Sequence, residues 1–347
     1  MLFWRSRRPV RHPRPVVSAS LLAVEVDGLP PGHTAARQRR EDTAAVLAVV
    51  HASDIAVLGH PDFSAEDVEE VFAAPHCDPA RDTWVVRDAG GAVVAWAYAD
   101  SRSPGGRQEC DVYLHPEADE DVRRALLAAV VARCGDRAAE AGVPEVTVDF
   151  GVVVGDDAWA ADLRAAGFEP RRRFSRMRIE LDGPRPAPEP PPGVTVSGFD
   201  PASERDWAVW HATYEASFAQ HWGHEPVPLE AFRARVLVDA DPGFPDWRLA
   251  VADGVPVGIA QCPGQFVNEG GGWIRNLGVL PGHRGRGIAR FLLEDAFARF
   301  AARGLRWAGL GVDTSNATGA LRLYEAVGMR AVFQVDSTQR EVPASPA

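Results

Sequence analysis

The stretch from Asn276 to Ala289 constrains the fold more than any other part of the chain. Its first four residues read as a buried strand, and the residues after them form a Gly-rich turn that opens a helix. Apolar residues in that helix recur at the spacing of one helical face: Ala289, Leu293, Ala296, Phe297 and Phe300. Because Gly285 and Gly287 have no side chains to cover the first turn, its unpaired backbone N–H groups can face a ligand. The sequence therefore predicts an anion site at the start of this helix.

Arginines surround this predicted anion site. Arg284, Arg286 and Arg290 add positive charge around the turn, so a ligand that carries phosphate is expected. Two common phosphate-binding patterns do not fit. A Walker A loop needs Lys and Ser or Thr where this chain has Ile288 and Ala289, and a dinucleotide fingerprint needs its third Gly where Arg290 stands.

The pattern Arg-x-x-Gly-x-Ala, from Arg284 to Ala289, resembles the pyrophosphate loop of the GCN5-related N-acetyltransferases, the GNAT family. The resemblance extends to both sides of the loop. Residues 273–279 are similar to the central strand of the family, and residues 310–316 and 323–329 are similar to its next strand and Tyr-bearing helix. It implies acetyl-CoA as co-substrate, bound by the central strand, the loop and one Asn: Leu277, Gly278, Val279, Arg284, Gly285, Arg286, Gly287, Ile288, Ala289 and Asn316.

The same resemblance implies catalytic roles. A backbone N–H near 277–279 would stabilise the oxyanion of the tetrahedral intermediate, and Tyr324 would protonate the departing thiolate. Both assignments have structural alternatives. Tyr324 could be core packing on an amphipathic helix, and Asn316 could hold the strand or cap the following helix instead of contacting the coenzyme.

The general base is the least determined residue. Arg275 and Asn276 stand where many relatives carry a carboxylate, so that pattern is broken here. The candidates are Glu269, just before the central strand, and His221, in a His/Trp segment where the family forms its acceptor wall. An imidazole titrates near neutral pH and is the better suited of the two. His221 could instead pack on the coenzyme, and deprotonation through water is a third possibility.

Chain length and internal similarity predict two domains. The 347 residues exceed the usual single domain of about 100–200 residues. Both halves show a helix, a hairpin, a strand, a helix and a strand in the same order, and aligning Gly167 with Gly328 sets the halves 161 residues apart. The predicted fold class is α/β, with two tandem GNAT-like domains, each a mixed, mostly antiparallel sheet flanked by helices.

Proline density sets the predicted boundary between these domains. Residues 182–193 contain six prolines and should form a semi-rigid, extended spacer. The predicted organisation is a basic disordered arm (1–17), a degenerate GNAT-like domain (18–181), the linker (182–193), a catalytic domain (194–340) and a tail (341–347).

The first half is expected to bind no coenzyme. At the spacing of 161 residues, Leu163 stands in place of Tyr324 and Gly155 in place of Asn316. The pyrophosphate loop is replaced by residues 116–121, which include four carboxylates that would repel a phosphate. This domain would then complete the substrate groove or stabilise its partner.

Composition excludes several classes of function. The net charge of -11 argues against binding to nucleic acids or anionic membranes, and no apolar run approaches the roughly 20 residues that span a bilayer. The four cysteines are scattered without zinc or disulfide spacing, so no metal is expected and a reducing cytoplasm is the predicted location. Cys262 could support a covalent route, but its local sequence has no His to activate it.

The predicted function is acetyl-CoA-dependent transfer of an acetyl group to a primary amine of a small molecule or peptide, by direct attack. The chain is expected to be a monomer or homodimer. Two alternatives remain open: acylation of a thiol-linked aminosugar precursor, as in tandem chains of the mycothiol synthase type, and a CoA-binding regulator without turnover.

Overall fold

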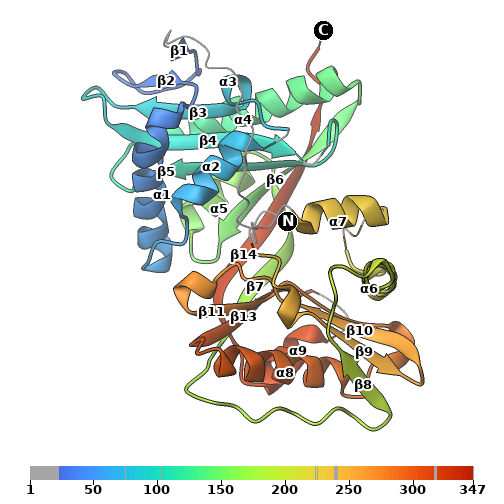
Figure 1. Cartoon of the computed structure of the whole chain (residues 1–347). Helices are drawn as coiled ribbons and strands as arrows, with labels where there is room; N and C mark the ends of the chain where they lie inside the picture. The colour runs from blue at the N-terminus through green and yellow to red at the C-terminus, as the bar shows by residue number, and fades with distance from the viewer. Residues whose placement is uncertain are drawn as a thin grey trace. The chain divides into compact units, whose positions relative to one another are not determined.

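The computed structural model describes residues 23–346, apart from 75, 102, 223, 225, 238–240 and 316–318. The predicted arm, 1–17, therefore lies outside the described residues. The chain divides into two compact units, each described here by itself (Figure 1). The described residues of the first unit are 23–173 and 335–346, and those of the second unit are 174–334.

The first unit is a sheet with helices on both faces. Its strands follow the order β1-β2-β3-β4-β5-β6-β14, and all neighbours are antiparallel except β5 and β6. The strands are β1 (Ala23–Val24), β2 (Thr34–Ala36), β3 (Thr83–Arg87), β4 (Val93–Ser101), β5 (Gln108–Leu114), β6 (Glu145–Val153) and the last part of β14 (Arg330–Pro343). The helices are α1 (Thr43–Leu58), α2 (Ala65–Ala73), α3 (Pro79–Asp82), α4 (Glu120–Ala141) and α5 (Asp157–Ala165).

Successive side chains on these strands point to opposite faces of the sheet, so the first unit has two hydrophobic cores. Trp84 and Val86 pack with α4 and α5, whereas Val85 and Trp96 pack with α1 and α2 on the opposite face. The helices in Figure 1 accordingly cover both faces of the sheet.

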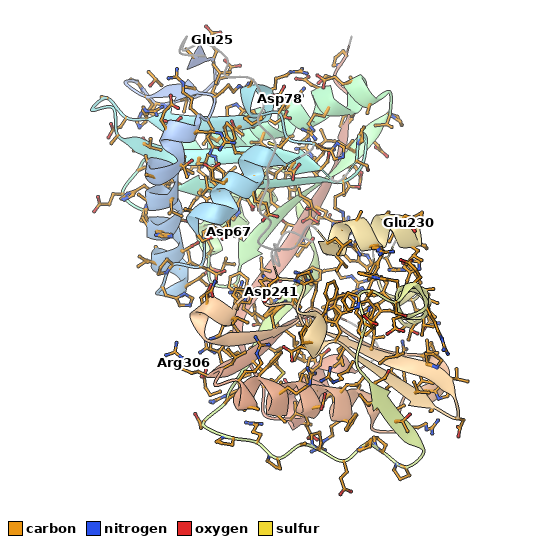
Figure 2. The ribbon with its side chains drawn as sticks, in the orientation of Figure 1. Glu25, Asp67, Asp78, Glu230, Asp241 and Arg306 are labelled. Carbon is orange, nitrogen blue, oxygen red and sulfur yellow. The ribbon has the colours of Figure 1, made fainter. Side chains whose placement is uncertain are left out.

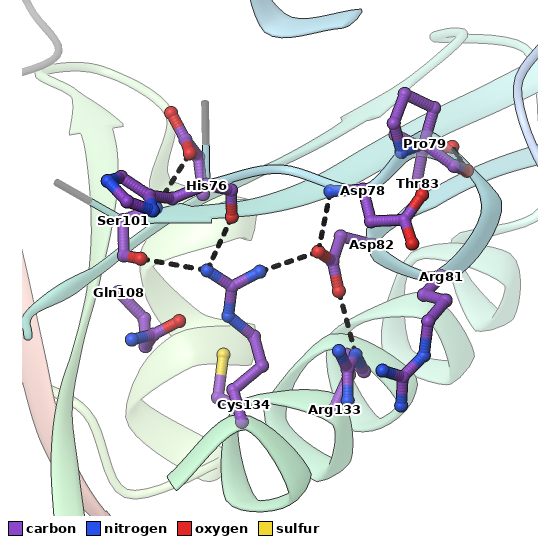
Figure 3. A network of polar contacts seen from close by, with 12 residues as sticks. His76, Asp78, Pro79, Arg81, Asp82, Thr83, Ser101, Gln108, Arg133 and Cys134 are labelled. Atoms are coloured by element: carbon purple, nitrogen blue, oxygen red, sulfur yellow. Dashed lines mark hydrogen bonds and ion pairs between the residues drawn. The ribbon is translucent and has the colours of Figure 1, made fainter. Parts of the chain in front are cut away.

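A buried ion-pair network fastens α4 to α3 in the first unit (Figure 3). Asp82, 2% exposed, accepts from Arg133 at 2.7 Å, from Arg137 at 2.6 Å and from the backbone N–H of Asp78 at 2.8 Å. Arg137 also donates to Ser101. Because both oxygens of the buried carboxylate are paired, we interpret the network as a structural contact that links α3 to α4.

The second unit has two short sheets. Strands β12-β10-β9-β8 form one antiparallel sheet, and β13 pairs with β7 on one side and, in parallel, with β11 on the other. The strands are β7 (Glu169–Glu180), β8 (Val194–Ser197), β9 (Arg248–Ala252), β10 (Val255–Gln261), β11 (Gly271–Ile274), β12 (Asn276–Val279) and β13 (Trp307–Asp313). The helices are α6 (Glu204–Phe218), α7 (Leu229–Leu237), α8 (Ile288–Ala302) and α9 (Ala320–Ala326). The order of elements repeats that of the first unit, as the tandem prediction required.

The division into units differs from the boundary predicted at the Pro-rich stretch. β7 begins in the first unit, but from Phe174 onward it pairs with β13 of the second. β14 begins in the second unit, and from Val335 onward it pairs with β6 of the first. The range predicted as 18–181 therefore lacks one strand of the first unit, and 194–340 lacks one strand of the second.

The predicted end of the chain differs for the same reason. A tail is predicted at 341–347, but β14 continues to Pro343. Prolines mark where the chain leaves the strand, and they carry no information about which distant strand will pair with it.

Candidate functional site

The predicted strand, turn and helix are all present around the Gly-rich stretch. A 3-10 turn (Pro281–His283) follows β12, and α8 begins at Ile288. Gly285 and Gly287 have φ values of 76° and 78°, a left-handed conformation that residues with a Cβ rarely adopt. Gly287 is the N-cap of α8 and forms no side-chain cap. The first N–H groups of α8 therefore have no side-chain acceptor and can bind an anion.

The three arginines near this turn are not equivalent. Arg284 donates from Nε to the carbonyl of Val279 at 3.1 Å, and from Nη2 to the carbonyl of Ser217 at 3.3 Å. Arg290 forms an exposed ion pair with Glu294 one turn along α8. Arg286 is exposed and contacts the ring of His283 at 3.0 Å. The sequence predicted a common positive field from all three, but the guanidinium of Arg284 is bonded to backbone carbonyls.

The predicted central strand is divided between two partners. β11 pairs in parallel with β13 up to the pair Ile274↔Leu310, whereas β12 pairs with β10. β12 is the edge strand of its sheet, so the chain parts from β13 after Ile274. The central strand therefore splays away from its neighbour after Ile274, and Arg275 lies at the point where the pairing changes.

The register of β12 identifies which backbone groups point to its unpaired edge, the edge away from β10. Leu280 donates to the carbonyl of Val257 at 2.9 Å, and Gly278 is opposite Ile259. Alternation in an antiparallel ladder then directs the N–H of Gly278 and Leu280 toward β10. The N–H groups of Leu277 and Val279 point to the open edge, where they can serve as donors to a ligand.

Helix α6 lies directly against β12. A Cβ added to Gly278 would come within 2.4 Å of Ser217 Oγ and 3.0 Å of the Phe218 ring. Any side chain at this position would therefore displace the last turn of α6. Two residues before Gly278 on β12, Asn276 lies opposite Gln261 of β10 and donates to its buried side chain. Sequence reasoning missed both contacts, although a Gly inside a strand is a known signal of close approach.

Tyr324 is buried on α9, with 7% of its surface exposed. It belongs to the hydrophobic cluster against which Leu277 also packs, so the helix and the open strand meet in one core. Burial raises the pKa of Tyr324 to about 12. The hydroxyl therefore keeps its proton at neutral pH, as a proton donor must.

Asn316 lies outside the described residues, so its predicted contact with the coenzyme stays a prediction. The alternative role, a cap on the following helix, stays a prediction as well; the N-cap position of α9 is Gly319, which forms no side-chain cap. In the turn before it, the N–H of Ser315 donates to Asp313 at 2.8 Å.

The two candidates for the base are placed differently. Glu269 is exposed and precedes β11, and Arg306, labelled in Figure 2, donates to its backbone carbonyl at 3.3 Å. In the chain, all of β11 lies between Glu269 and Leu277 on β12.

His221 follows the end of α6, which contacts β12. Its backbone N–H donates to the carbonyl of Phe218 at 2.7 Å, and its ring nitrogen Nδ1 lies 3.1 Å from the carbonyl of Trp222. A carbonyl only accepts, so this bond assigns the proton to Nδ1 and leaves the lone pair on Nε2. His224 differs, because its Nε2 lies 2.9 Å from the carboxylate of Glu215, an interaction that the sequence did not suggest.

Cys262 is buried, and burial raises the pKa of its thiol to about 12. A thiol that stays protonated is a poor nucleophile, which favours direct transfer over an acyl-cysteine. Trp207 and Trp210 are buried core residues on α6. Among the described residues, no group of three or more His, Cys, Asp or Glu side chains could hold a metal ion, and no helix is long and apolar enough to cross a membrane.

Comparisons with known proteins agree on one family. Residues 207–329 match the acetyltransferase (GNAT) family. The mycothiol acetyltransferase of Thermomonospora curvata is 32% identical over 243 residues, which cover 69% of this chain and 75% of that protein.

Two solved structures resemble the whole chain. A GCN5-related N-acetyltransferase from Sphaerobacter thermophilus has a TM-score of 0.78 and 27% identity, covering 92% of this chain and 98% of its own. A tandem GNAT protein from the clavulanic acid biosynthesis pathway has a TM-score of 0.62 at 18% identity, covering 94% and 99%, and supports the tandem fold.

Proposed function

The chain belongs to the GNAT family and is an acetyl-CoA-dependent N-acetyltransferase, and from this premise we propose that the second unit binds acetyl-CoA and transfers its acetyl group directly to a primary amine. The observation that supports this proposal is that two ligand-binding features lie close together in the chain. The free edge of β12 offers N–H donors at Leu277 and Val279, and a few residues later α8 begins with an uncapped turn. These two features suit the thioester end and the pyrophosphate end of one extended coenzyme.

Each binding residue has a physical role in this proposal. The N–H groups of Arg286 and Gly287, just before α8, and those of Ile288 and Ala289, in its first turn, suit the pyrophosphate. Gly285 and Gly287 allow the conformation that exposes those groups. The backbone of 277–279 runs alongside the pantetheine arm, and one of its free N–H groups stabilises the oxyanion.

The proposed reaction is a direct transfer from acetyl-CoA to the amine through a tetrahedral intermediate, without an acyl-enzyme. A neutral amine attacks the thioester carbonyl, forming the C–N bond, and the C–S bond breaks. The proton of the incoming ammonium first passes to His221 Nε2, or to water. Tyr324 then gives its proton to the departing sulfur, and the proton that the nitrogen loses as the amide forms returns Tyr324 to its neutral state through solvent. Glu269 is the less favoured base because of its place before β11.

The acceptor is proposed from chemistry and from the relatives. An amine substrate follows from the family, and the curated relative is named for mycothiol. A thiol-linked aminosugar precursor of mycothiol is therefore the first acceptor to test, before simple aminosugars, polyamines and peptide N-termini. A regulator without turnover is disfavoured, because the buried Tyr324 and the open edge of β12 are both present. A cytoplasmic location, and a monomeric or homodimeric state, stay predictions.

A thiol-release assay tests this function. Purified chain with acetyl-CoA is expected to release free thiol only when an acceptable amine is present, with the mycothiol precursor the best substrate of the panel. Binding of acetyl-CoA without turnover on any amine would favour the regulator. A chain that binds no acetyl-CoA would contradict the interpretation of the loop.

One acetyl-CoA is expected per chain. In the first unit, the N-cap Asp119 accepts from the N–H of Asp121, and Glu120 adds a second acid to the first turn of α4. A capped, acidic helix start repels phosphate, unlike the uncapped start of α8. Isothermal titration calorimetry of the whole chain should give a stoichiometry near one, and a value near two would contradict the inactive first unit.

His221→Ala is expected to lower kcat/KM for the amine by about 100-fold, the lower end of what a positioned base contributes. His224→Gln is the matched control, because His224 is bonded to Glu215 and a Gln can keep that bond. An unchanged kcat/KM in His221→Ala would remove His221 from the mechanism.

A further inference from the structure

The side chain of Arg284 joins two elements of the proposed site. Its Nε bonds to the carbonyl of Val279, which is on the free edge of β12, and its Nη2 bonds to the carbonyl of Ser217 in the last turn of α6. Both bonds are partly buried. One guanidinium thus holds the strand that offers the oxyanion donor and the helix that leads to the acceptor wall.

Each acceptor needs a donor that its own element does not provide. The carbonyls in the last turn of a helix have no intrahelical partner and favour a nearby cation. The last turn of α6 contains no basic residue, so Arg284 supplies that cation from another part of the chain. The carbonyl of Val279 points away from β10, where the ladder offers it no donor.

The two elements are also in close contact, so a shift in one must reach the other. There is no room for a Cβ at Gly278 beside Ser217 and Phe218. The chain then continues into Phe218–Trp222, called the wall segment below. The backbone N–H of His221 donates to the Phe218 carbonyl and closes the first turn of this segment.

The neighbouring Arg286 provides a contrast within the same loop. Both arginines are exposed residues, but only Arg284 bonds to backbone carbonyls outside the loop. Within the described part of the chain, the Arg286 guanidinium contacts the ring of His283, so its charge is available to an anion. The two positions therefore separate a geometric role from a purely electrostatic one.

We propose that Arg284 is a positioning residue that fixes the open edge of β12 and the wall segment relative to each other, and that it affects acetyl transfer independently of the pyrophosphate. This inference rests on the proposed function of the same site. A ligand to pyrophosphate would act only through the binding of a donor that contains pyrophosphate. A positioning residue also acts on the amine, and on a donor that lacks the nucleotide.

The test compares Arg284→Ala, Arg284→Lys and Arg286→Ala with wild type on two donors, acetyl-CoA and S-acetylpantetheine. At saturating acetyl-CoA, Arg284→Ala should lower kcat/KM for the amine by about tenfold to 100-fold, because small displacements in a reacting pair have effects of that size. It should lower turnover of S-acetylpantetheine by a similar factor. Arg286→Ala should raise KM for acetyl-CoA and leave S-acetylpantetheine unaffected.

Arg284→Lys separates charge from geometry, because a Lys keeps the charge but cannot span two carbonyls in the planar fork of Arg. It should resemble Arg284→Ala in amine kcat/KM. A normal rate in Arg284→Lys, or a defect in Arg284→Ala that disappears at saturating acetyl-CoA, would overturn the proposal. Thermal melting of each variant shows whether a loss reflects unfolding. A wild-type chain without turnover would refute the proposed function, whereas an unaffected Arg284→Ala beside an active wild type would refute only this inference.

Discussion

A Tyr324→Phe chain is expected to acetylate its amine about 100-fold more slowly than wild type at saturating acetyl-CoA, the usual contribution of a positioned acid. The substitution removes one hydroxyl and leaves the ring, so the packing of the cluster around Tyr324 should persist. KM for acetyl-CoA should change little, because the hydroxyl acts when the C–S bond breaks. Steady-state thiol release with each chain measures both quantities.

The pH dependence sharpens this test. Burial raises the pKa of Tyr324 to about 12 from an ordinary value near 10, so the folded chain holds this proton more tightly than the unfolded chain. Tyr324 should therefore stay a proton donor up to pH 10, and its ionisation should weaken the fold only as pH rises from about 10 to 12. Tyr214→Phe, which removes a hydroxyl from α6, is the control. If Tyr324→Phe keeps wild-type kcat, Tyr324 has a packing role alone.

A chain that ends at Gln334 is expected to lose the cooperative folding of its first unit. The deletion removes the nine residues of β14 that pair with β6, including the buried Val335 and Val342. Burying a Val contributes about 1.5–3 kcal/mol, and a whole domain is stable by only about 5–15 kcal/mol. The loss of a full strand should therefore exceed the stability that remains.

A buried carboxylate on β6 adds to this loss. Asp149, 9% exposed, accepts from Ser337 and Gln339 of β14. Burial raises the pKa of Asp149, and those two hydrogen bonds offset part of the effect. Without β14 the carboxylate loses both donors.

Thermal unfolding followed by limited proteolysis measures the result. Residues 23–173 should become susceptible to protease, whereas acetyl-CoA should still protect 174–334, because that unit keeps its described strands. A chain that ends at Ser345 is the matched control, because it keeps all of β14 and the bond from the backbone N–H of Ser345 to the carbonyl of Gly135. Equal melting of the two shortened chains would contradict the assigned role of β14.

Local patterns predicted the loop and its helix, and non-local partners explain what was missed. Gly285 and Gly287 act through their own backbone conformation, which a sequence displays directly. Arg284 looked like a phosphate ligand because its partner Ser217 lies 67 residues away, and no local pattern indicates that bond. The central strand is divided into β11, which pairs with β13, and β12, which pairs with β10, and residues 271–279 give no local sign of that division.

The exchanged ends of β7 and β14 also have a consequence for biosynthesis. A ribosome makes residues 174–334 before it makes Val335–Pro343. The second unit can therefore complete its fold while the first, although translated earlier, still waits for a partner along β6. Until β14 emerges, that exposed strand edge is open to pairing with other nascent chains. The unit that is translated first is thus the last to become safe from aggregation.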